Sequence, residues 1–288
     1  MNIVNENLEP RKIALITVYF PTDENVRNIR MIQEQVDFVY ICDNSPNNTN
    51  VFQNLENVEY IFFNKNLGIP KAFNYVLKNR YFQENDFIIF FDQDSTIANN
   101  HINNLCIQYN IQQEKDKQIG CIGPNFINEA SGRLDKDSGI ENIEVREIIT
   151  SSMMMKFSIL KQINFWNEEI FLDLADWDLC WRLKKMNYKS FQASSVVMKH
   201  SIGISEKKFL FFTIKKGNPI REYYQTRDCL SLLSKKYVPI IMKVRFVLMV
   251  TVRPLLHVLF LDNKRKRLFY IKRGIMDYKK NIMGEYNV

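Results

Sequence analysis

The chain has 288 residues, of which 46% are hydrophobic and 25% charged. This composition supports a substantial core, allows one large domain or one domain with an appendage, and argues against global disorder. The formal net charge is +7, but residues 1–206 carry 20 basic and 27 acidic side chains, whereas residues 207–288 carry 19 and 5. A basic block of this kind usually meets an anionic partner: phospholipid, nucleic acid or a phosphorylated substrate.

Cysteine and histidine usage narrows the class further. The five cysteines are dispersed without a paired spacing, and the N-terminus lacks the layout of a secretory signal. We therefore expect reduced thiols in a cytoplasmic protein. Three histidines are too few to favour a multi-histidine zinc site. The sequence also has no Walker A loop, no GxGxxG and no GxSxG, so it lacks the usual phosphate cradles and the serine nucleophile elbow.

In the first half of the chain, short apolar runs alternate with amphipathic segments. Strands are expected over residues 13–18, 38–45, 58–64, 87–92 and 119–124. Helices are expected over residues 23–35, 68–80 and 101–113. This alternation predicts an α/β fold with a doubly wound, mostly parallel sheet flanked by helices. In such sheets ligands bind beyond the carboxyl ends of the strands.

Polar clusters follow three of these strands, and the most informative one is Asp92-Gln93-Asp94 after the apolar run 87–91. The other two are Asp43-Asn44-Ser45 and Asn64-Lys65-Asn66. Paired carboxylates at a strand end suit a hard divalent cation such as Mg²⁺ or Mn²⁺, which prefers oxygen ligands and bridges to phosphates. An ordinary Asp-rich turn is the alternative.

The second half returns to a strand over 148–155, an acidic segment leading into a helix over 171–188, and a strand over 194–200. Asp173, Asp176 and Asp178 cluster where that helix begins. One of them suffices to complement the helix N-terminus, so a second role as general base for a hydroxyl nucleophile is open. Trp177 and Trp181 are i, i+4 neighbours whose default role is packing; lining an acceptor sugar is the alternative.

Three further residues could have either a structural or a ligand-binding role. His200 follows the late strand and is either structural or a ligand. Arg221 and Arg227 flank two tyrosines in an expected helix over 220–236. They are either helix-surface arginines or contacts to a diphosphate through charge-assisted hydrogen bonds.

The charge and apolar content of the sequence change after residue 206, and this change predicts a catalytic domain over 1–206 and a helical region over 207–288. Residues 238–261 are very apolar but interrupted by basic side chains and a proline, so they fall short of the ~20 apolar residues that span a bilayer. A basic cluster interleaved with aromatics follows over 263–274. This basic, apolar appendage predicts an interfacial anchor on an anionic membrane surface, or else a helical subdomain with a solvated basic face.

The order of motifs resembles the family 2 glycosyltransferases, which are inverting enzymes of the GT-A fold, and most closely their bacterial rhamnosyltransferase-like branch. The segments that carry the resemblance span residues 13–228; they are ITVYFP, ICDNS, NLGIPKAFN, FFDQDS, IFLDLADWDLCWRL, MKHSIG and REYYQTRD. The FFDQDS and REYYQTRD segments favour the rhamnosyl branch.

The resemblance assigns roles to individual positions. Asp176 would be the general base, and Asp92 and Asp94 would hold a divalent metal and the donor diphosphate, with His200 at a position where some relatives contact metal or phosphate. The expected nucleotide-binding positions are Thr17, Tyr19, Asp43, Asn66, Gly68, Asn74 and Asp92. The expected acceptor or supporting positions are Asp178, Arg182, Trp177, Arg221 and Arg227.

The sequence departs from the family pattern in three places. Ala175 precedes Asp176 where many relatives carry Glu, and the segment 151–155 replaces a glycine-containing turn on the acceptor side. The glycine that often follows the position of Asp43 is also missing.

The resulting hypothesis is a single-displacement transfer assisted by Mn²⁺ or Mg²⁺. A sugar, L-rhamnose from dTDP-rhamnose, moves to a hydroxyl of a lipid-linked or growing surface-polysaccharide acceptor such as capsule. The enzyme would be cytoplasmic and peripheral at the inner face of the cell membrane. The alternatives are a UDP-hexose donor, a sugar nucleotidyltransferase, which would need a glycine-rich N-terminal loop that is absent, and a non-enzymatic protein that binds nucleic acid or membrane through its basic tail. We expect no nucleic-acid partner.

Overall fold

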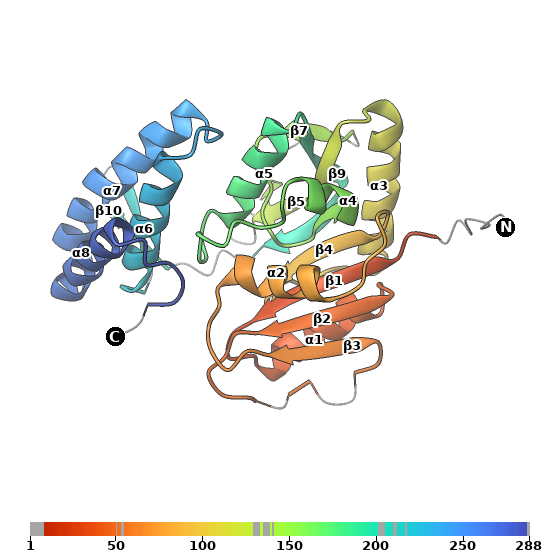
Figure 1. Ribbon diagram of the computed structural model, residues 1–288, viewed down its shortest axis with the longest axis horizontal. Helices are drawn as coiled ribbons and strands as arrows, with labels where there is room; N and C mark the ends of the chain where they lie inside the picture. Colours follow the sequence, from red (N-terminus) through yellow and green to blue (C-terminus); the bar gives the residue numbers. More distant parts are fainter. Residues whose placement is uncertain are drawn as a thin grey trace.

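The computed structural model describes residues 9–49, 51–52, 55–128, 133–134, 139, 141–200, 205–209, 212–216 and 218–286 (Figure 1). A mixed α/β body forms one part of the molecule, and three C-terminal helices lie against its side.

The first half of the sheet is the parallel block expected from the sequence. Its strands are β1 (Lys12–Val18), β2 (Phe38–Asp43), β3 (Val58–Phe62) and β4 (Phe87–Asp92), in the order β3-β2-β1-β4. Strands buried on both faces are continuous apolar runs rather than alternating ones, and β1 and β4 are buried along nearly their whole length. The carboxyl ends of these four strands therefore lie along one edge of the sheet.

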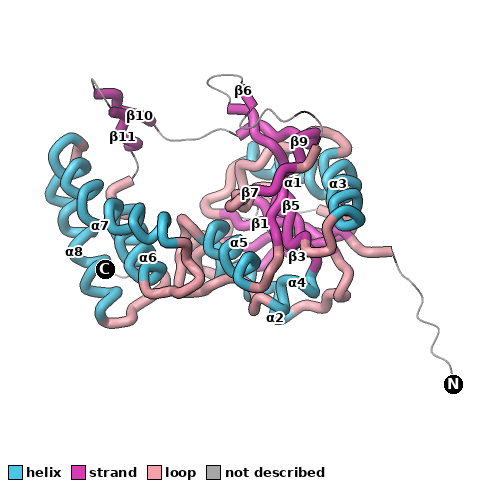
Figure 2. Tube along the Cα trace, turned by 90° about the horizontal axis from the view of Figure 1, so that it is seen from above, coloured by secondary structure: helices cyan, strands magenta, loops and turns pink. Residues whose placement is uncertain are grey.

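Helices cover both faces of this sheet, as a doubly wound fold requires. The helices α1 (Asp23–Gln33) and α3 (His101–Lys115) pack on one face, and α2 (Ile69–Asn79) packs on the other. Figure 2 shows α3 and α2 on opposite sides of the strands. The α/β fold class and its arrangement are confirmed.

Beyond β4 the sheet becomes mixed. The order continues β8-β5-β9-β7, and the elements of this half are β5 (Ile119–Asn128), β6 (Arg133–Leu134), β7 (Ile143–Val145), β8 (Met153–Lys156), α4 (Phe157–Gln162), α5 (Ala175–Lys185) and β9 (Lys189–His200). The strand expected over 148–155 begins only at Met153, because Ser152 before it has a left-handed backbone with φ of 64°. Strand β8 is antiparallel to both of its neighbours.

The C-terminal part contains a two-stranded ribbon and three helices. They are β10 (Ser205–Phe209), β11 (Phe212–Lys216), α6 (Arg221–Leu233), α7 (Ile240–Phe260) and α8 (Lys264–Lys279). Within the described part of the chain, none of the helices combines the length and apolar character that crossing a bilayer demands.

The start of the C-terminal part shares the hydrophobic core of the body. Cys229 and Leu232 of α6 and Met242 and Phe246 of α7 are buried in the same cluster as Trp181 of α5. The rings of Trp181 and Phe246 are 6.0 Å apart. The packing therefore crosses the boundary expected near residue 206.

Candidate active site

A cleft of about 470 Å³ opens at the carboxyl ends of the parallel strands. The loops after β1, β2 and β4 form its floor, and α6 and the residues after α8 form its far wall. The site residues predicted from the sequence that line it are Thr17, Tyr19, Asn66, Gly68, Asp92 and Arg221. Residues from seven different segments of the chain thus meet in one concave surface, as expected at the carboxyl edge of an open α/β sheet.

Asp92 is the carboxylate at the end of β4. Its side chain is half-buried, and its Oδ2 accepts a hydrogen bond of 2.9 Å from the hydroxyl of Ser151. Burial raises the pKa of Asp92 to about 6; the Ser151 hydrogen bond opposes this shift and the nearby carboxylate of Asp94 adds to it. Asp94 itself is exposed. The two carboxylates are thus close enough to repel each other, and a bound cation would relieve that repulsion.

Asp176 is the second residue of α5. Its Oδ1 accepts a 2.8 Å hydrogen bond from the backbone N–H of Trp177. Burial raises the pKa of Asp176 to about 7, and the charges of Asp92 and Asp173 add to the shift, while hydrogen bonds from the backbone amides of Trp177 and Thr150 oppose it. A carboxyl group with a pKa near neutrality is suited to general base catalysis. The neighbouring residues Thr150 and Ser151 contact Asp176 and Asp92 respectively, so one turn connects the two carboxylates.

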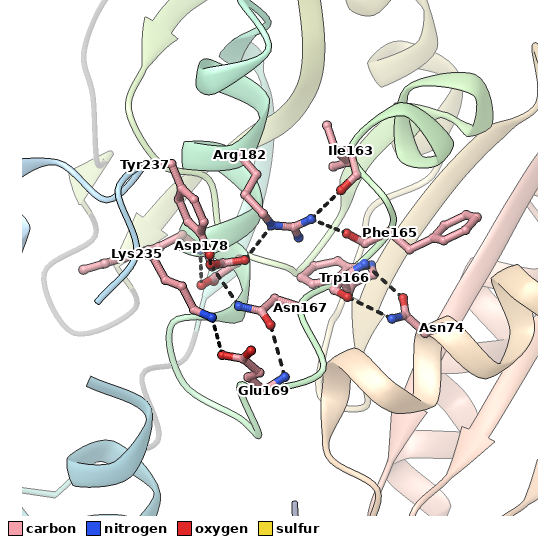
Figure 3. A network of polar contacts seen from close by, with 12 residues as sticks. Asn74, Ile163, Phe165, Trp166, Asn167, Glu169, Asp178, Arg182, Lys235 and Tyr237 are labelled. Atoms are coloured by element: carbon pink, nitrogen blue, oxygen red, sulfur yellow. Dashed lines mark hydrogen bonds and ion pairs between the residues drawn. The ribbon is translucent and has the colours of Figure 1, made fainter. Parts of the chain in front are cut away.

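Asp178 and Arg182 are the fourth and eighth residues of α5 and hold this helix to the preceding loop (Figure 3). Arg182 Nε donates to Asp178 Oδ2 at 2.7 Å, and its Nη1 donates to the carbonyls of Ile163 and Phe165. Tyr237, which precedes α7, donates its hydroxyl proton to Asp178 Oδ1 at 2.5 Å. Asp178 is fully buried, so this pair positions α5 and hence Asp176.

The residues expected at the nucleotide differ in their access to the cleft. Tyr19 is 44% exposed, and its backbone N–H is held by Gln93 Oε1 at 2.7 Å. Gly68 has φ of +78°, and a Cβ there would lie 2.4 Å from the carbonyl oxygen of Phe171. Only glycine fits this position, because both the backbone conformation and the space exclude a side chain.

Asp43 and Asn74 do not line the cleft. Asp43 is fully buried; its Oδ1 accepts from Ser45 N–H at 2.7 Å and its Oδ2 from Tyr60 Oη at 2.6 Å. Asn74, also buried, donates to the carbonyl of Trp166 at 2.9 Å and accepts from its N–H at 3.0 Å. Both side chains stabilise the loops that surround the site.

The remaining predicted residues are placed as follows. Arg221 lines the cleft and donates to Asp173 Oδ1 at 2.6 Å. Arg227 is fully buried and bridges Asp228, Tyr223 and the carbonyl of Gly284. Trp177 is half-buried beneath the guanidinium of Arg245, 5.1 Å from the ring centre. His200 ends β9, but its side chain lies outside the part of the structure that is described.

Several residues in or beside the cleft had no feature in the sequence that pointed to the site. Ser151 is 59 positions from Asp92 and looked like part of a strand. Phe171 and Tyr224 stack with ring centres 4.2 Å apart and planes within 7° of parallel. Glu285 and Tyr286 also face the cleft. Glu285 is one of only five acidic residues in the basic block 207–288, and this scarcity was the one feature that could have drawn attention to it.

The residues present fit a divalent cation whose remaining ligands are water and substrate phosphates. Among the described residues, no point is surrounded by three or more His, Cys, Asp or Glu side chains. Asp92 and Asp94 supply two carboxylates, and Mg²⁺ and its relatives are often held by one or two carboxylates together with water and substrate phosphates.

Comparison with known proteins agrees with this geometry. No family model matches the chain. Over 290 residues the chain is 28% identical to "dTDP-rhamnosyl transferase RfbF" of Shigella flexneri, an alignment that covers 94% of this chain and 95% of that protein.

Two solved structures have the same fold at 10% identity. The mannosyltransferase PcManGT from Pyrobaculum calidifontis, in complex with GDP-Man and Mn²⁺, superposes with a TM-score of 0.56 over 96% of this chain and 88% of that one. GalNAc-T7 with UDP, GalNAc and Mn²⁺ gives 0.54 over 96% of this chain and 59% of that one.

The fold is therefore that of the GT-A glycosyltransferases, and the protein is a glycosyltransferase. In sequence it is rhamnosyltransferase-like, through its similarity to RfbF along nearly the whole chain.

Proposed function

We propose that the protein transfers L-rhamnose from dTDP-rhamnose to a hydroxyl group of a lipid-linked or growing surface polysaccharide. The observation that carries the proposal is that Asp92, which lines the cleft at the end of β4, lies close enough to Asp176 at the start of α5 for its charge to add to the raised pKa of Asp176. The similarity to RfbF over 94% of the chain supports the choice of donor.

The floor of the cleft would hold the donor. Thr17 and Tyr19 would lie beside the nucleotide, and Asp92 and Asp94 would hold Mn²⁺ or Mg²⁺. A divalent cation bound there stabilises the negative charge of the departing nucleoside diphosphate. The hydrogen bond from Ser151 fixes the orientation of the Asp92 carboxylate.

Asp176 acts as the general base. With a pKa of about 7, a substantial fraction of its carboxyl group is ionised at neutral pH and can accept the proton of the acceptor hydroxyl as that oxygen attacks the anomeric carbon. The displacement is a single step, so the anomeric configuration inverts. The buried pair of Asp178 and Arg182 keeps the base in place.

The test is a nucleotide-release assay with a panel of sugar nucleotides in the presence of Mn²⁺ or Mg²⁺. We expect dTDP-rhamnose to be turned over fastest; faster turnover of a UDP-hexose would replace the proposed donor. Asp176→Asn should reduce kcat by at least about 10²-fold with nearly unchanged donor affinity. Asp94→Ala should weaken nucleotide binding only when the metal is present. A D176N enzyme with normal turnover would remove Asp176 from the mechanism.

Membrane association completes the proposal. The exposed apolar side chains of α7 include Ile241, Val244, Leu248, Leu255 and Leu259, which recur at helical spacing. Exposed lysines and arginines follow at the start of α8. An apolar face beside a basic one is typical of helices that lie in the interface of an anionic bilayer. This would hold the enzyme at the inner face of the cell membrane, where a lipid-linked acceptor is available.

The membrane test uses point variants, because truncation from residue 238 would remove core residues such as Phe246. The double variant Leu255→Glu, Leu259→Glu should lose binding to vesicles containing anionic lipid, whereas Ile111→Glu on α3 of the body should bind as the wild type does. Equal binding by both variants would contradict the role of α7.

A further inference from the structure

A short segment after α8, residues 284–286, returns to the donor cleft although it is more than 200 positions away from most of the cleft floor. Glu285 and Tyr286 line the same cleft as Thr17 and Asp92. Glu285 Oε2 accepts a hydrogen bond from the backbone N–H of Asn66 at 3.2 Å, a contact that spans 219 positions. The acidic side chain is thus held in the wall of the cleft.

This segment is anchored by buried partners. The fully buried Arg227 donates from Nη1 to the carbonyl of Gly284 at 2.7 Å. The backbone N–H of Tyr286 donates to the hydroxyl of Tyr224 at 3.1 Å, and the ring of Tyr286 packs edge-on against Tyr223, with ring centres 5.0 Å apart. The backbone on both sides of Glu285 is therefore held by buried residues of α6.

The position of Glu285 along the cleft follows from the strand order of the sheet. The loop containing Asn66 follows β3 and is tied to the end of β2 by the bond from Leu67 N–H to Asn44 Oδ1 at 3.0 Å. Asp92 is at the end of β4. In the order β3-β2-β1-β4, the two carboxylates are separated by two to three strand spacings, or about 10–14 Å. If the diphosphate lies at Asp92, the nucleoside extends toward Glu285.

Charge excludes a phosphate at the Glu285 end. Of the described residues that line the cleft, Arg221 is the one with a cationic side chain, and it is already paired with Asp173. A carboxylate without a cation repels phosphate but accepts hydrogen bonds readily from neutral N–H or O–H donors. Asp43, the other carboxylate near this end, is fully buried and does not line the cleft.

We infer that Glu285 accepts a hydrogen bond from the imide N3–H of the pyrimidine base of the donor nucleotide and so contributes to nucleotide specificity. This inference rests on the proposed function for the placement of the diphosphate. It concerns the nucleoside alone, and its test therefore does not require transfer.

The test measures the affinity of the full-length protein for dTDP, N3-methyl-dTDP, CDP and inorganic pyrophosphate by titration calorimetry with Mn²⁺. Glu285→Ala should weaken dTDP binding by about tenfold or more and leave pyrophosphate binding unchanged. N3-methylation should weaken binding to the wild type but have little further effect in E285A. Glu285→Gln keeps the shape and can also donate to the N3 acceptor of cytosine, so its preference for dTDP over CDP should fall.

A matched control is Glu84→Ala, which removes an exposed glutamate paired with Lys161 outside the cleft and should bind every ligand as the wild type does. Normal melting of E285Q shows that the fold is retained. Wild-type affinity of E285A for dTDP, tighter binding by E285A, or an equal loss of pyrophosphate would each overturn the inference. If the wild type binds UDP and not dTDP, the proposed donor is wrong while the Glu285 comparison proceeds with UDP.

Discussion

Replacing Asp176 by Asn should stabilise the protein, and the gain should grow with pH. Burial raises the pKa of this carboxyl group from 3.8 to about 7 in the folded protein. Its contribution to stability is therefore fully present below pH 3.8 and is lost as the pH rises through about 7, because the folded state must then hold an unfavourable buried charge. Asn never acquires that charge.

The magnitude follows from the shift. Between pH 5 and about pH 7 the carboxyl group is ionised in the unfolded chain but still largely protonated in the folded protein. Over these roughly two pH units the folded state loses at most ~2.7 kcal/mol of stability relative to the unfolded state. Because Asp176 keeps partial contact with water, screening reduces this figure, and we expect the stabilisation by D176N to increase by about 1–2 kcal/mol between pH 5 and pH 8.

The assay is urea unfolding followed by circular dichroism at pH 5 and pH 8, with a chelator present to remove metal. Asp178→Asn, two positions along the same helix, is the opposite-sign control. It breaks a buried ion pair with Arg182 and should destabilise the protein by about 3 kcal/mol. A pH-independent effect of D176N, or a loss of stability at pH 8, would show that Asp176 is not held in a desolvated environment.

Two further predictions concern the supporting structure. Gly68→Ala should lower the free energy of unfolding by about 3 kcal/mol, because the new Cβ would meet the carbonyl of Phe171 at a position with positive φ. Gly139→Ala is the control: its φ is +71° but nothing lies within 4 Å of the new Cβ, so the same urea titration should show a loss of only about 1 kcal/mol. Glu222→Gln removes the charge facing the buried Arg267 at 2.9 Å and should lower stability by about 3 kcal/mol and the melting temperature with it; an unchanged melting temperature would contradict this role.

The sheet and its carboxyl edge could be predicted because they depend on local patterns. The apolar run ending at Asp92 forms β4 over the expected residues, and the alternation of strands and helices determines where its carboxyl end lies. The helix that begins near Asp176 was recognisable from its acidic start and its apolar periodicity.

The walls of the site could not be predicted, since they depend on contacts between distant segments. The hydrogen bond from Ser151 to Asp92 requires the antiparallel pairing of β8 with β4. Arg227 lies on a helix whose inward face was unknown, so the sequence could not distinguish a diphosphate contact from the buried bridge it makes to Gly284. Likewise the apolar sequence of α7 could not show that Met242 and Phe246 are buried against the body while Ile241 and its neighbours on the other side of the helix are exposed.

The shared core of α5, α6 and α7 has a consequence for how the chain folds during synthesis. Domains usually fold as units as they leave the ribosome, the N-terminal one first. Here the cluster around Trp181 is completed by Leu232 and Phe246, and the loop before α5 is held by the bond from Phe171 N–H to Asp228 at 2.9 Å. The body around α5 therefore cannot reach its final packing until α7 has been translated. A nascent chain halted near residue 206 would expose the apolar surface that these later helices cover.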